Sequence, residues 1–297
     1  MKISMIKYAL SIAIASLLAS ACTPHSKEKD QKETITVSIP PLKYLIDKIS
    51  GNDYNVNVMV ATGACQETYE PTPKQMKDIS KSNVYIGIPD LEFEQKWVNG
   101  ITRNNDTLKY IDVTNGIEKE EATCNHSEHD GHHHHGASDP HYWLSPKNFK
   151  VMAAATYNEL VALHPEKKEA YTANYNKLIA SVDSIDLQIK SKLANLRTGK
   201  FIIYHPALTY FAKDYGLEQI SIEKDGKEPA VDYMKTLINQ AKKDNIKTIF
   251  VQKEFDISLI QSLGKEVGAT VEPIDTFSYD WLDSMNKISN ALSKANK

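Results

Sequence analysis

The sequence predicts an α/β protein with two lobes of mainly parallel sheet, flanked by helices and joined by one long spanning helix. Short β-prone segments alternate with amphipathic helical segments in both halves of the chain, and this order is typical of parallel sheets covered on both faces. An unbroken apolar pattern of helical period separates the two halves. At 297 residues the chain is long enough to form two hydrophobic cores.

The first half, residues 34–164, is expected to form the N-terminal lobe. Its β-branched and apolar runs alternate with stretches of helical period. Strands are therefore expected at 34–39, 55–60 and 84–88, and helices at 42–50 and 74–82.

The second half, residues 199–297, repeats this alternation and is expected to form the C-terminal lobe. Gly216 and Gly268 each follow a helical pattern, which is typical of a helix stop. Strands are expected at 200–204, 219–222, 248–252 and 270–274, and helices at 208–215, 231–244 and 257–267.

The segment between the lobes, residues 165–198, is expected to form the connecting helix. Pro165 suits a first helical turn, and a helix of this length would reach roughly 50 Å. An oligomeric coiled coil is the alternative, but it would require further heptads with charged flanking positions. Apolar residues recur every three or four positions, at Tyr171, Tyr175, Leu178, Val182, Ile185, Ile189, Leu193 and Leu196.

The N-terminal residues 1–21 are expected to be a signal peptide. Lys2 and Lys7 precede an apolar run that is too short to remain as a membrane span. The run ends in Leu17-Leu18-Ala19-Ser20-Ala21-Cys22, which resembles the lipobox of bacterial lipoproteins. Cys22 is then the lipidated first residue, residues 22–33 form a flexible tether, and the protein is an extracytoplasmic, membrane-anchored lipoprotein on the periplasmic side or the cell surface. An ordinary signal peptide with an incidental cysteine is the alternative.

The composition excludes several classes of function. Hydrophobic residues make up 41% of the chain and charged residues 25%, which are ordinary values for a globular protein. Lys and Arg number 35 against 38 acidic residues, and no basic block is present, so a nucleic acid partner is not expected. Three cysteines are too few for a disulfide scaffold or a four-thiolate zinc site.

Six of the ten histidines lie in one stretch, residues 124–136, which has neither helical nor strand period. Imidazole is a good ligand for zinc, copper and nickel. We expect a loop that collects metal loosely, whereas an inert polar run is the alternative. Its candidate auxiliary ligands are His126, His129, His132, His133, His134 and His135.

Three further residues stand at positions that favour a specific site. His141 lies between two prolines, in a segment expected to form a rigid loop before a helix that starts near Pro146. His205 directly follows an expected strand, and Asp275 ends another, at the edge where α/β sheets bind ligands. Taken singly, each residue is equally consistent with a structural role in the core or in hydrogen bonding.

Together, these segments resemble the metal-specific solute-binding proteins of bacterial ABC transporters, which include zinc and manganese uptake proteins and related lipoprotein adhesins. The resemblance covers nearly the whole mature chain. It implies two lobes with one metal in the cleft between them, capture of that metal outside the cytoplasm, and delivery to a membrane permease by a monomer. The segments that carry it are 63–73, 139–146 and 205–217, with additional likeness at Glu228-Pro229 and 249–251.

The resemblance also implies a ligand set. His141, His205 and Asp275 match the second, third and fourth ligands of the family. The first ligand does not match, because Glu67 stands where relatives have histidine, two residues before Tyr69. Two imidazoles and two carboxylates leave manganese as an alternative, while the histidine-rich loop resembles the zinc branch, so zinc is expected.

Cys65 and Cys124 are expected to form a disulfide. They are the cysteines that remain once Cys22 is lipidated, and an extracytoplasmic compartment is oxidising. Each also lies in a segment leading to a proposed ligand. The competing interpretation makes Cys65 a thiolate ligand.

Two functions of other classes remain as alternatives. A zinc hydrolase could use Glu67 as its base, but the chain has no His-Glu-x-x-His, Gly-x-Ser-x-Gly or Gly-rich phosphate motif, so we do not expect an enzyme. A surface adhesin that binds host molecules is the other alternative.

Overall fold

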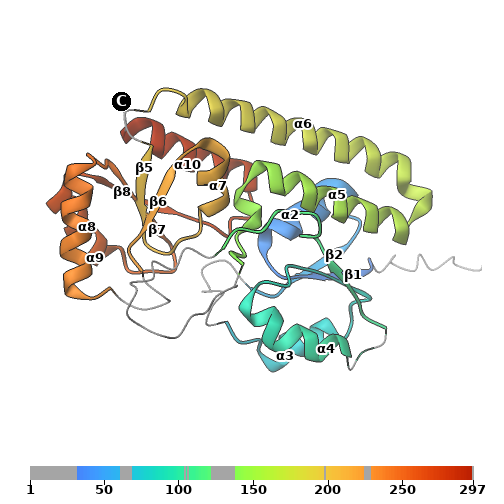
Figure 1. The fold of residues 1–297 in the computed structure, drawn as a ribbon. Helices are drawn as coiled ribbons and strands as arrows, with labels where there is room; N and C mark the ends of the chain where they lie inside the picture. Colours follow the sequence, from blue (N-terminus) through green and yellow to red (C-terminus); the bar gives the residue numbers. More distant parts are fainter. Residues whose placement is uncertain are drawn as a thin grey trace, which may run out of the picture. The chain divides into compact units, whose positions relative to one another are not determined.

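The computed structural model of the chain describes residues 32–60, 69–103, 105, 107–121, 138–196, 199–223 and 229–295. From Glu33 onward the chain belongs to one compact unit. It contains two four-stranded sheets in which all paired strands run parallel (Figure 1). The predicted α/β class with two parallel sheets is therefore confirmed.

The two sheets have the same internal order. The first consists of β1 (Thr34–Val37), β2 (Asn55–Val58), β3 (Val84–Gly87) and β4 (Lys109–Asp112), in the order β2-β1-β3-β4. The second consists of β5 (Lys200–Ile203), β6 (Glu218–Ser221), β7 (Thr248–Gln252) and β8 (Thr270–Ile274), in the order β6-β5-β7-β8. Because every strand is parallel, the carboxyl ends of each sheet lie at one edge, where α/β proteins bind ligands.

Helices connect these strands, and several begin or end at residues suited to that position. Thr72 and Gln75 form a reciprocal capping box at the start of α3, and Ser145 caps α5 with a proline in the next position. Gly216 and Gly268 adopt left-handed conformations at the ends of α7 and α9, as predicted. The helices are α2 (Pro40–Ser50), α3 (Pro73–Ile79), α4 (Asn99–Arg103), α5 (Pro146–Leu163), α6 (Lys168–Leu193), α7 (Thr209–Tyr215), α8 (Val231–Lys243), α9 (Ile257–Val267) and α10 (Trp281–Ala295), with short turns of other helical types at Glu94–Val98, Tyr142–Leu144 and Pro165–Lys167.

The predicted connecting helix is α6, which is shorter at both ends than the range 165–198. Pro165–Lys167 forms a separate 3-10 turn before it, and Leu193 ends it. α6 packs against α2, α5 and α10 of its own chain (Figure 1). These helices cover the apolar stripe that the coiled-coil alternative would have placed against a second chain. The buried residues of α6 are Tyr171, Leu178, Val182, Ile185, Ile189 and Leu193.

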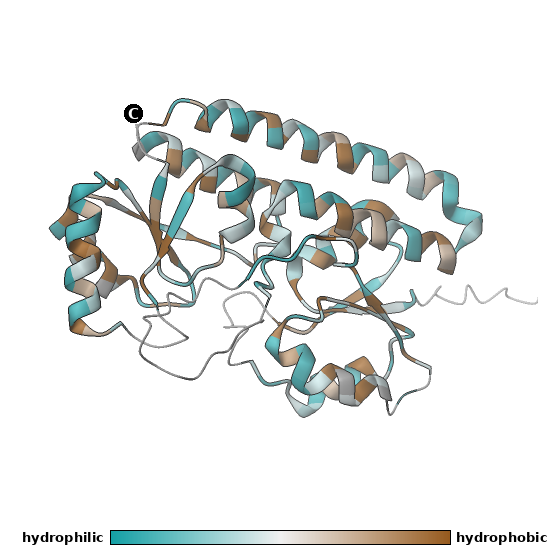
Figure 2. Ribbon diagram, in the orientation of Figure 1, coloured by the Kyte–Doolittle hydropathy of each residue, from teal (hydrophilic) through white to brown (hydrophobic). Residues whose placement is uncertain are grey.

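One hydrophobic core extends from the first sheet, through α5, α6 and α10, to one face of the second sheet. Side chains alternate along β5: Phe201 and Ile203 belong to this core, whereas Ile202 belongs to a second core with α8 and α9. The central strands β3, β5 and β7 are accordingly mostly apolar, whereas α8 and α9 each have an apolar and a polar face (Figure 2). A core shared by the two sheets restricts their relative movement.

A pair of tryptophans strengthens this connection between the sheets. Trp143, just before α5, donates from its indole to the carbonyl of Thr276 at 2.7 Å, and Trp281 at the start of α10 donates to the carbonyl of Trp143 at 2.6 Å. Trp281 also stacks on Phe149 with ring centroids 3.9 Å apart. The loop that carries His141 is therefore fixed to the second sheet through buried hydrogen bonds.

Among the described helices, none combines the length and the apolar character that crossing a bilayer requires.

A carboxyl group is buried at the carboxyl edge of the first sheet. Glu94 accepts hydrogen bonds from the hydroxyl of Ser38, from Tyr110 at 2.5 Å and from the backbone N–H of Ile88 at 3.0 Å. Burial raises the pKa of Glu94 to about 7, although these hydrogen bonds favour the ionised form. The folded protein therefore retains a proton on Glu94 that the unfolded chain releases near pH 4.5.

This raised pKa makes the stability of the fold depend on pH. The proton on Glu94 stabilises the folded state fully below about pH 4.5, and that contribution is lost as the pH rises through about 7. The loss amounts to about 3 kcal/mol of unfolding free energy. Glu94→Gln should remove this part of the dependence, so urea unfolding of both proteins at about pH 5 and about pH 7.5 measures it. Equal pH dependence of the unfolding free energy in the two proteins would contradict a raised pKa of Glu94.

Candidate metal site

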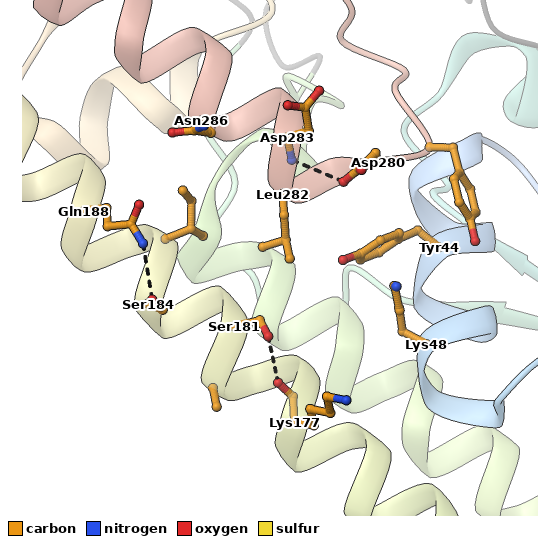
Figure 3. A pocket seen from close by; sticks show the side chains of 13 residues that line it. Tyr44, Lys48, Lys177, Ser181, Ser184, Gln188, Asp280, Leu282, Asp283 and Asn286 are labelled. Carbon is orange, nitrogen blue, oxygen red and sulfur yellow. Dashed lines mark hydrogen bonds between the residues drawn. The ribbon is translucent and has the colours of Figure 1, made fainter.

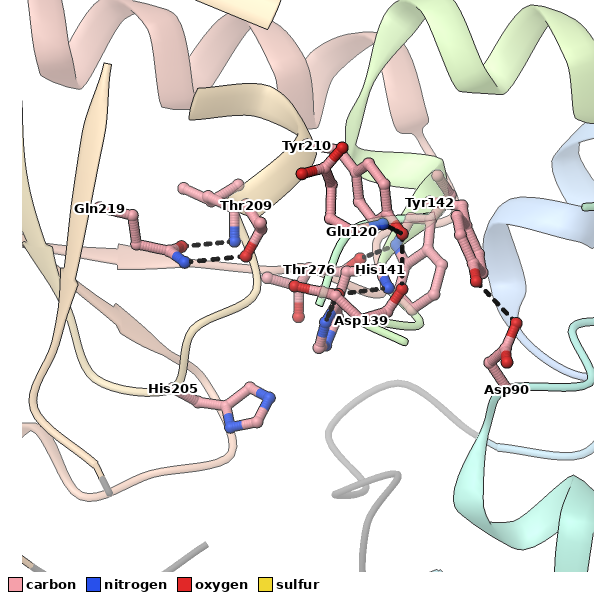
Figure 4. A network of polar contacts seen from close by, with 12 residues as sticks. Asp90, Glu120, Asp139, His141, Tyr142, His205, Thr209, Tyr210, Gln219 and Thr276 are labelled. Atoms are coloured by element: carbon pink, nitrogen blue, oxygen red, sulfur yellow. Dashed lines mark hydrogen bonds and ion pairs between the residues drawn. The ribbon is translucent and has the colours of Figure 1, made fainter. Parts of the chain in front are cut away.

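Two of the four predicted ligands lie side by side. The imidazole rings of His141 and His205 have centroids 5.2 Å apart, at an interplanar angle of 61° (Figure 4). His141 is 3% exposed, and the side chain of His205 is 13% exposed. They are separated by 64 positions in the sequence, so the fold alone brings them together.

His205 is positioned by the middle of the second sheet. It follows β5 after one residue, and its backbone N–H and carbonyl bond the side-chain amide of Gln252 at 3.3 and 2.6 Å. Its Nδ1 lies 3.0 Å from the carboxylate of Glu223, just after the neighbouring strand β6. Because β6, β5 and β7 are adjacent, residues at the neighbouring strand ends hold both the backbone and the ring of His205.

His141 is positioned by its own loop and by α7. The carboxylate of Asp139 accepts from the backbone N–H of His141 at 2.8 Å and lies 2.8 Å from its Nδ1. Tyr210 of α7 donates to the carbonyl of Asp139 at 2.9 Å (Figure 4). Burial raises the pKa of Asp139, but the charge of His141 and its hydrogen bonds outweigh burial, so the pKa lies below its usual value. Asp139 is therefore an anion beside the imidazole.

Both imidazoles have the same hydrogen-bond arrangement, and it determines which ring nitrogen can bind a metal. Since a carboxylate only accepts, the Nδ1 atoms of His141 and His205 carry the proton in the neutral rings. The lone pair is then on Nε2. A metal-binding histidine commonly donates its other ring N–H to a carboxylate, which orients the ring and increases its basicity. This pair of rings therefore has the chemistry of a transition-metal site.

Asp275 lies at the end of β8 but is engaged elsewhere. Its Oδ2 pairs with Lys253 Nζ at 3.1 Å, and its Oδ1 accepts from the backbone N–H of Phe277 at 3.1 Å. Within the described ranges, no three His, Cys, Asp or Glu side chains gather closely enough to hold a metal ion. The structure thus joins His141 to His205, and it does not join Asp275 to them.

The remaining predicted site residues fall outside the described ranges. Glu67 and Cys65 are within 61–68, and Cys22 is within 1–31. Residues 122–137 contain Cys124 together with His126, His129, His132, His133, His134 and His135.

Two acidic residues near the histidines were not predicted. Glu223 is 7% exposed and orients His205; only knowledge that β6 pairs with β5 would have indicated it. The pKa of Glu254 is raised, mainly by burial, although a backbone hydrogen bond lowers it. The nearby charge of Asp275 raises this pKa further, and that of His205 lowers it. Glu254 is therefore within electrostatic reach of both predicted ligands of the second sheet.

A groove of about 790 Å³ lies at a different place, between α2, α6 and the start of α10 (Figure 3). Tyr44, Lys48, Lys177, Asp280 and Asp283 are among its lining residues. No histidine lines this groove, so we do not consider it a candidate for the metal site.

The family model and two of the relatives that match this chain are named for zinc binding or zinc uptake. The family model described as zinc-uptake complex component A, periplasmic, matches residues 35–295. The zinc-binding lipoprotein AdcA of Streptococcus pneumoniae is 28% identical over 279 residues, which cover 90% of this chain and 54% of that protein. This chain thus spans about half the length of that relative.

Two further likenesses extend over nearly the full length of both proteins. The high-affinity zinc uptake system protein ZnuA of Bacillus subtilis is 26% identical and is covered to 86%, with 89% of this chain aligned. A solved structure of a ZnuA deletion mutant with zinc bound superposes with a TM-score of 0.80 at 34% identity, covering 89% of this chain and 98% of that one. The chain belongs to the family of periplasmic zinc-uptake component A proteins.

Proposed function

We propose that this protein captures zinc outside the cytoplasm and delivers it to the permease of an ABC transporter. The observation that carries the proposal is the pair of imidazoles, 5.2 Å apart, each with Nδ1 bound to a buried carboxylate. Two Nε2 atoms oriented in advance lose little conformational entropy when a metal binds. The family match and the zinc-binding relatives support zinc as the cargo.

The full ligand set that we propose is Glu67, His141, His205 and Asp275. Two carboxylates and two neutral imidazoles would neutralise a divalent cation. His205 and Asp275 follow β5 and β8 at the carboxyl edge of the second sheet, and His141 lies in the loop before α5. Manganese is the competing cargo because oxygen ligands suit it. No step of this function requires catalysis, and we propose a binding protein that is not an enzyme.

The proposal also includes the N-terminal anchor. Lipidation at Cys22 would hold the monomer at the membrane beside the permease, with residues 22–33 as a tether.

A surface adhesin is the alternative function. A metal-uptake defect in a strain that lacks the protein would distinguish a transporter subunit from an adhesin.

The first test is whether the histidine pair or the histidine-rich loop holds zinc tightly. His141→Ala and His205→Ala should each weaken zinc binding at least about 100-fold, since each removes a ligand from an organised site. Deletion of 124–136 should leave one tight site, and zinc should still raise its melting temperature. Competitive chelator titration with zinc and manganese provides the measurement.

The matched control for this test is His164→Ala. His164 pairs with Glu33 and Glu166 beside the start of β1, at the opposite edge of the first sheet. Its replacement should leave zinc affinity unchanged. If deletion of 124–136 abolishes tight binding while both His→Ala variants retain it, the proposed site is wrong.

The second test addresses the carboxylates behind the histidines. Asp139→Asn and Glu223→Gln should weaken zinc binding about 10- to 100-fold, because a neutral amide leaves the imidazole less basic and less firmly oriented. Nitrogen-15 NMR of the metal-free protein should show Nδ1-protonated His141 and His205 in the wild type. Asp186→Asn, on α6, is the control. Unchanged affinity in both variants would contradict the role of the carboxylates.

The third test concerns the first ligand. Glu67→Ala should weaken zinc binding clearly, because water replaces an anionic donor. Glu67→His should preserve or strengthen binding, since imidazole is a strong zinc donor of similar reach. Isothermal titration calorimetry of both variants measures this, and an unchanged affinity in Glu67→Ala would exclude Glu67 as a ligand.

A further inference from the structure

We infer that Lys253 competes with the incoming metal for Asp275, so that zinc binds by displacing an ammonium group of the protein itself. This inference rests on the proposed function, because it concerns how the proposed ligand Asp275 becomes available. Lys253 acts through Asp275 and is not a ligand.

The backbone fixes the two partners at the same level of the second sheet. Lys253 directly follows β7 and Asp275 directly follows β8, whose last residues, Gln252 and Ile274, are paired in register. The N–H of Lys253 continues this pairing with a hydrogen bond to the carbonyl of Ile274 at 3.1 Å. The pairing of the strands therefore places the ammonium group next to the carboxylate.

Both carboxylate oxygens of Asp275 are already used. Oδ2 pairs with Lys253 Nζ at 3.1 Å, and Oδ1 accepts from the N–H of Phe277. Since the backbone carbonyl of Asp275 accepts from the hydroxyl of Ser284 at 3.0 Å, the main chain is held and the side chain is the part that can turn. The ammonium group on Oδ2 and an incoming zinc ion therefore compete for the same carboxylate charge.

The surroundings allow Lys253 to leave. Its side chain is 56% exposed, whereas that of Asp275 is 16% exposed. Both line a cavity of about 210 Å³, which Asp283, Ser284 and Lys287 also border. Lys287 pairs with Asp283 at 2.6 Å, so the two lysines and two aspartates balance in charge. A released Lys253 can extend into this cavity or into water at little cost.

The direction of the effect follows from charge. In the metal-free protein the lysine stabilises the Asp275 carboxylate, and in the loaded protein it repels the bound cation. Both effects oppose zinc binding. The pair therefore lowers the affinity of the site and aids release of the metal at the permease.

The test is a chelator-competition titration of zinc with stopped-flow release kinetics. Lys253→Gln should bind zinc roughly 3- to 10-fold more tightly and release it more slowly, a size set by a half-exposed ion pair. Lys253→Arg, which keeps the charge, should resemble the wild type. In an Asp275→Asn background the effect of Lys253→Gln should shrink, because the partner is absent.

The matched control is Lys242→Gln. Lys242 pairs with Glu266 at the end of α8, and α8 leads into the amino end of β7. Lys242→Gln removes the same positive charge as Lys253→Gln, and it should leave zinc affinity unchanged. Crystal structures of the metal-free and zinc-loaded wild type provide a second readout, in which the contact between Lys253 and Asp275 should be present without zinc and broken with it.

The outcomes separate this inference from the proposed function. A wild type without a zinc site dependent on His141 and His205 would overturn both. A wild type with that site, in which Lys253→Gln leaves zinc affinity unchanged or weaker, or in which the ion pair persists in the zinc-loaded crystal, would overturn the inference alone.

Discussion

The hydrogen bond from an imidazole Nδ1 to a buried carboxylate is the interaction on which the proposed site depends. It occurs twice, between His141 and Asp139 and between His205 and Glu223. Each bond fixes the tautomer and the direction of its ring, so that the ring lone pair is on Nε2. Without these carboxylates, the rings could rotate or reverse their protonation, and their closeness would not define a metal position.

The fold supplies these bonds from segments far apart in the sequence. Glu223 reaches His205 because β6 pairs with β5, and Gln252 holds the His205 backbone because β7 lies on the other side. The His141 loop is bonded to the segment after β8 by Trp143 and to α7 by Tyr210. Because the core continues between the sheets, these contacts favour metal binding by movement of side chains over wide domain closure. Asp275, which pairs with Lys253, is one side chain that can move in this way.

Much of the architecture could be predicted from the sequence, since β7, β8 and α9 have the boundaries that periodicity indicated. β4 was missed because Lys109–Asp112 is short and polar at both ends, and its pairing with β3 stabilises it. α10 was also missed, although its apolar face follows helical period. His141 and His205 were predicted from strand ends and a proline-bounded loop, whereas the roles of Glu223, Glu94 and Lys253 depend on strand neighbours that periodicity cannot specify.

The two oriented Nε2 atoms define where zinc should bind. The most direct test of this position is a crystal structure of the zinc-loaded protein with anomalous data collected at the zinc absorption edge. We expect one strong peak between the two rings, about 2.0 to 2.1 Å from Nε2 of His141 and of His205. A peak bound through Nδ1 of either ring, or bound only by residues 124–136 while both rings remain uncoordinated, would contradict it.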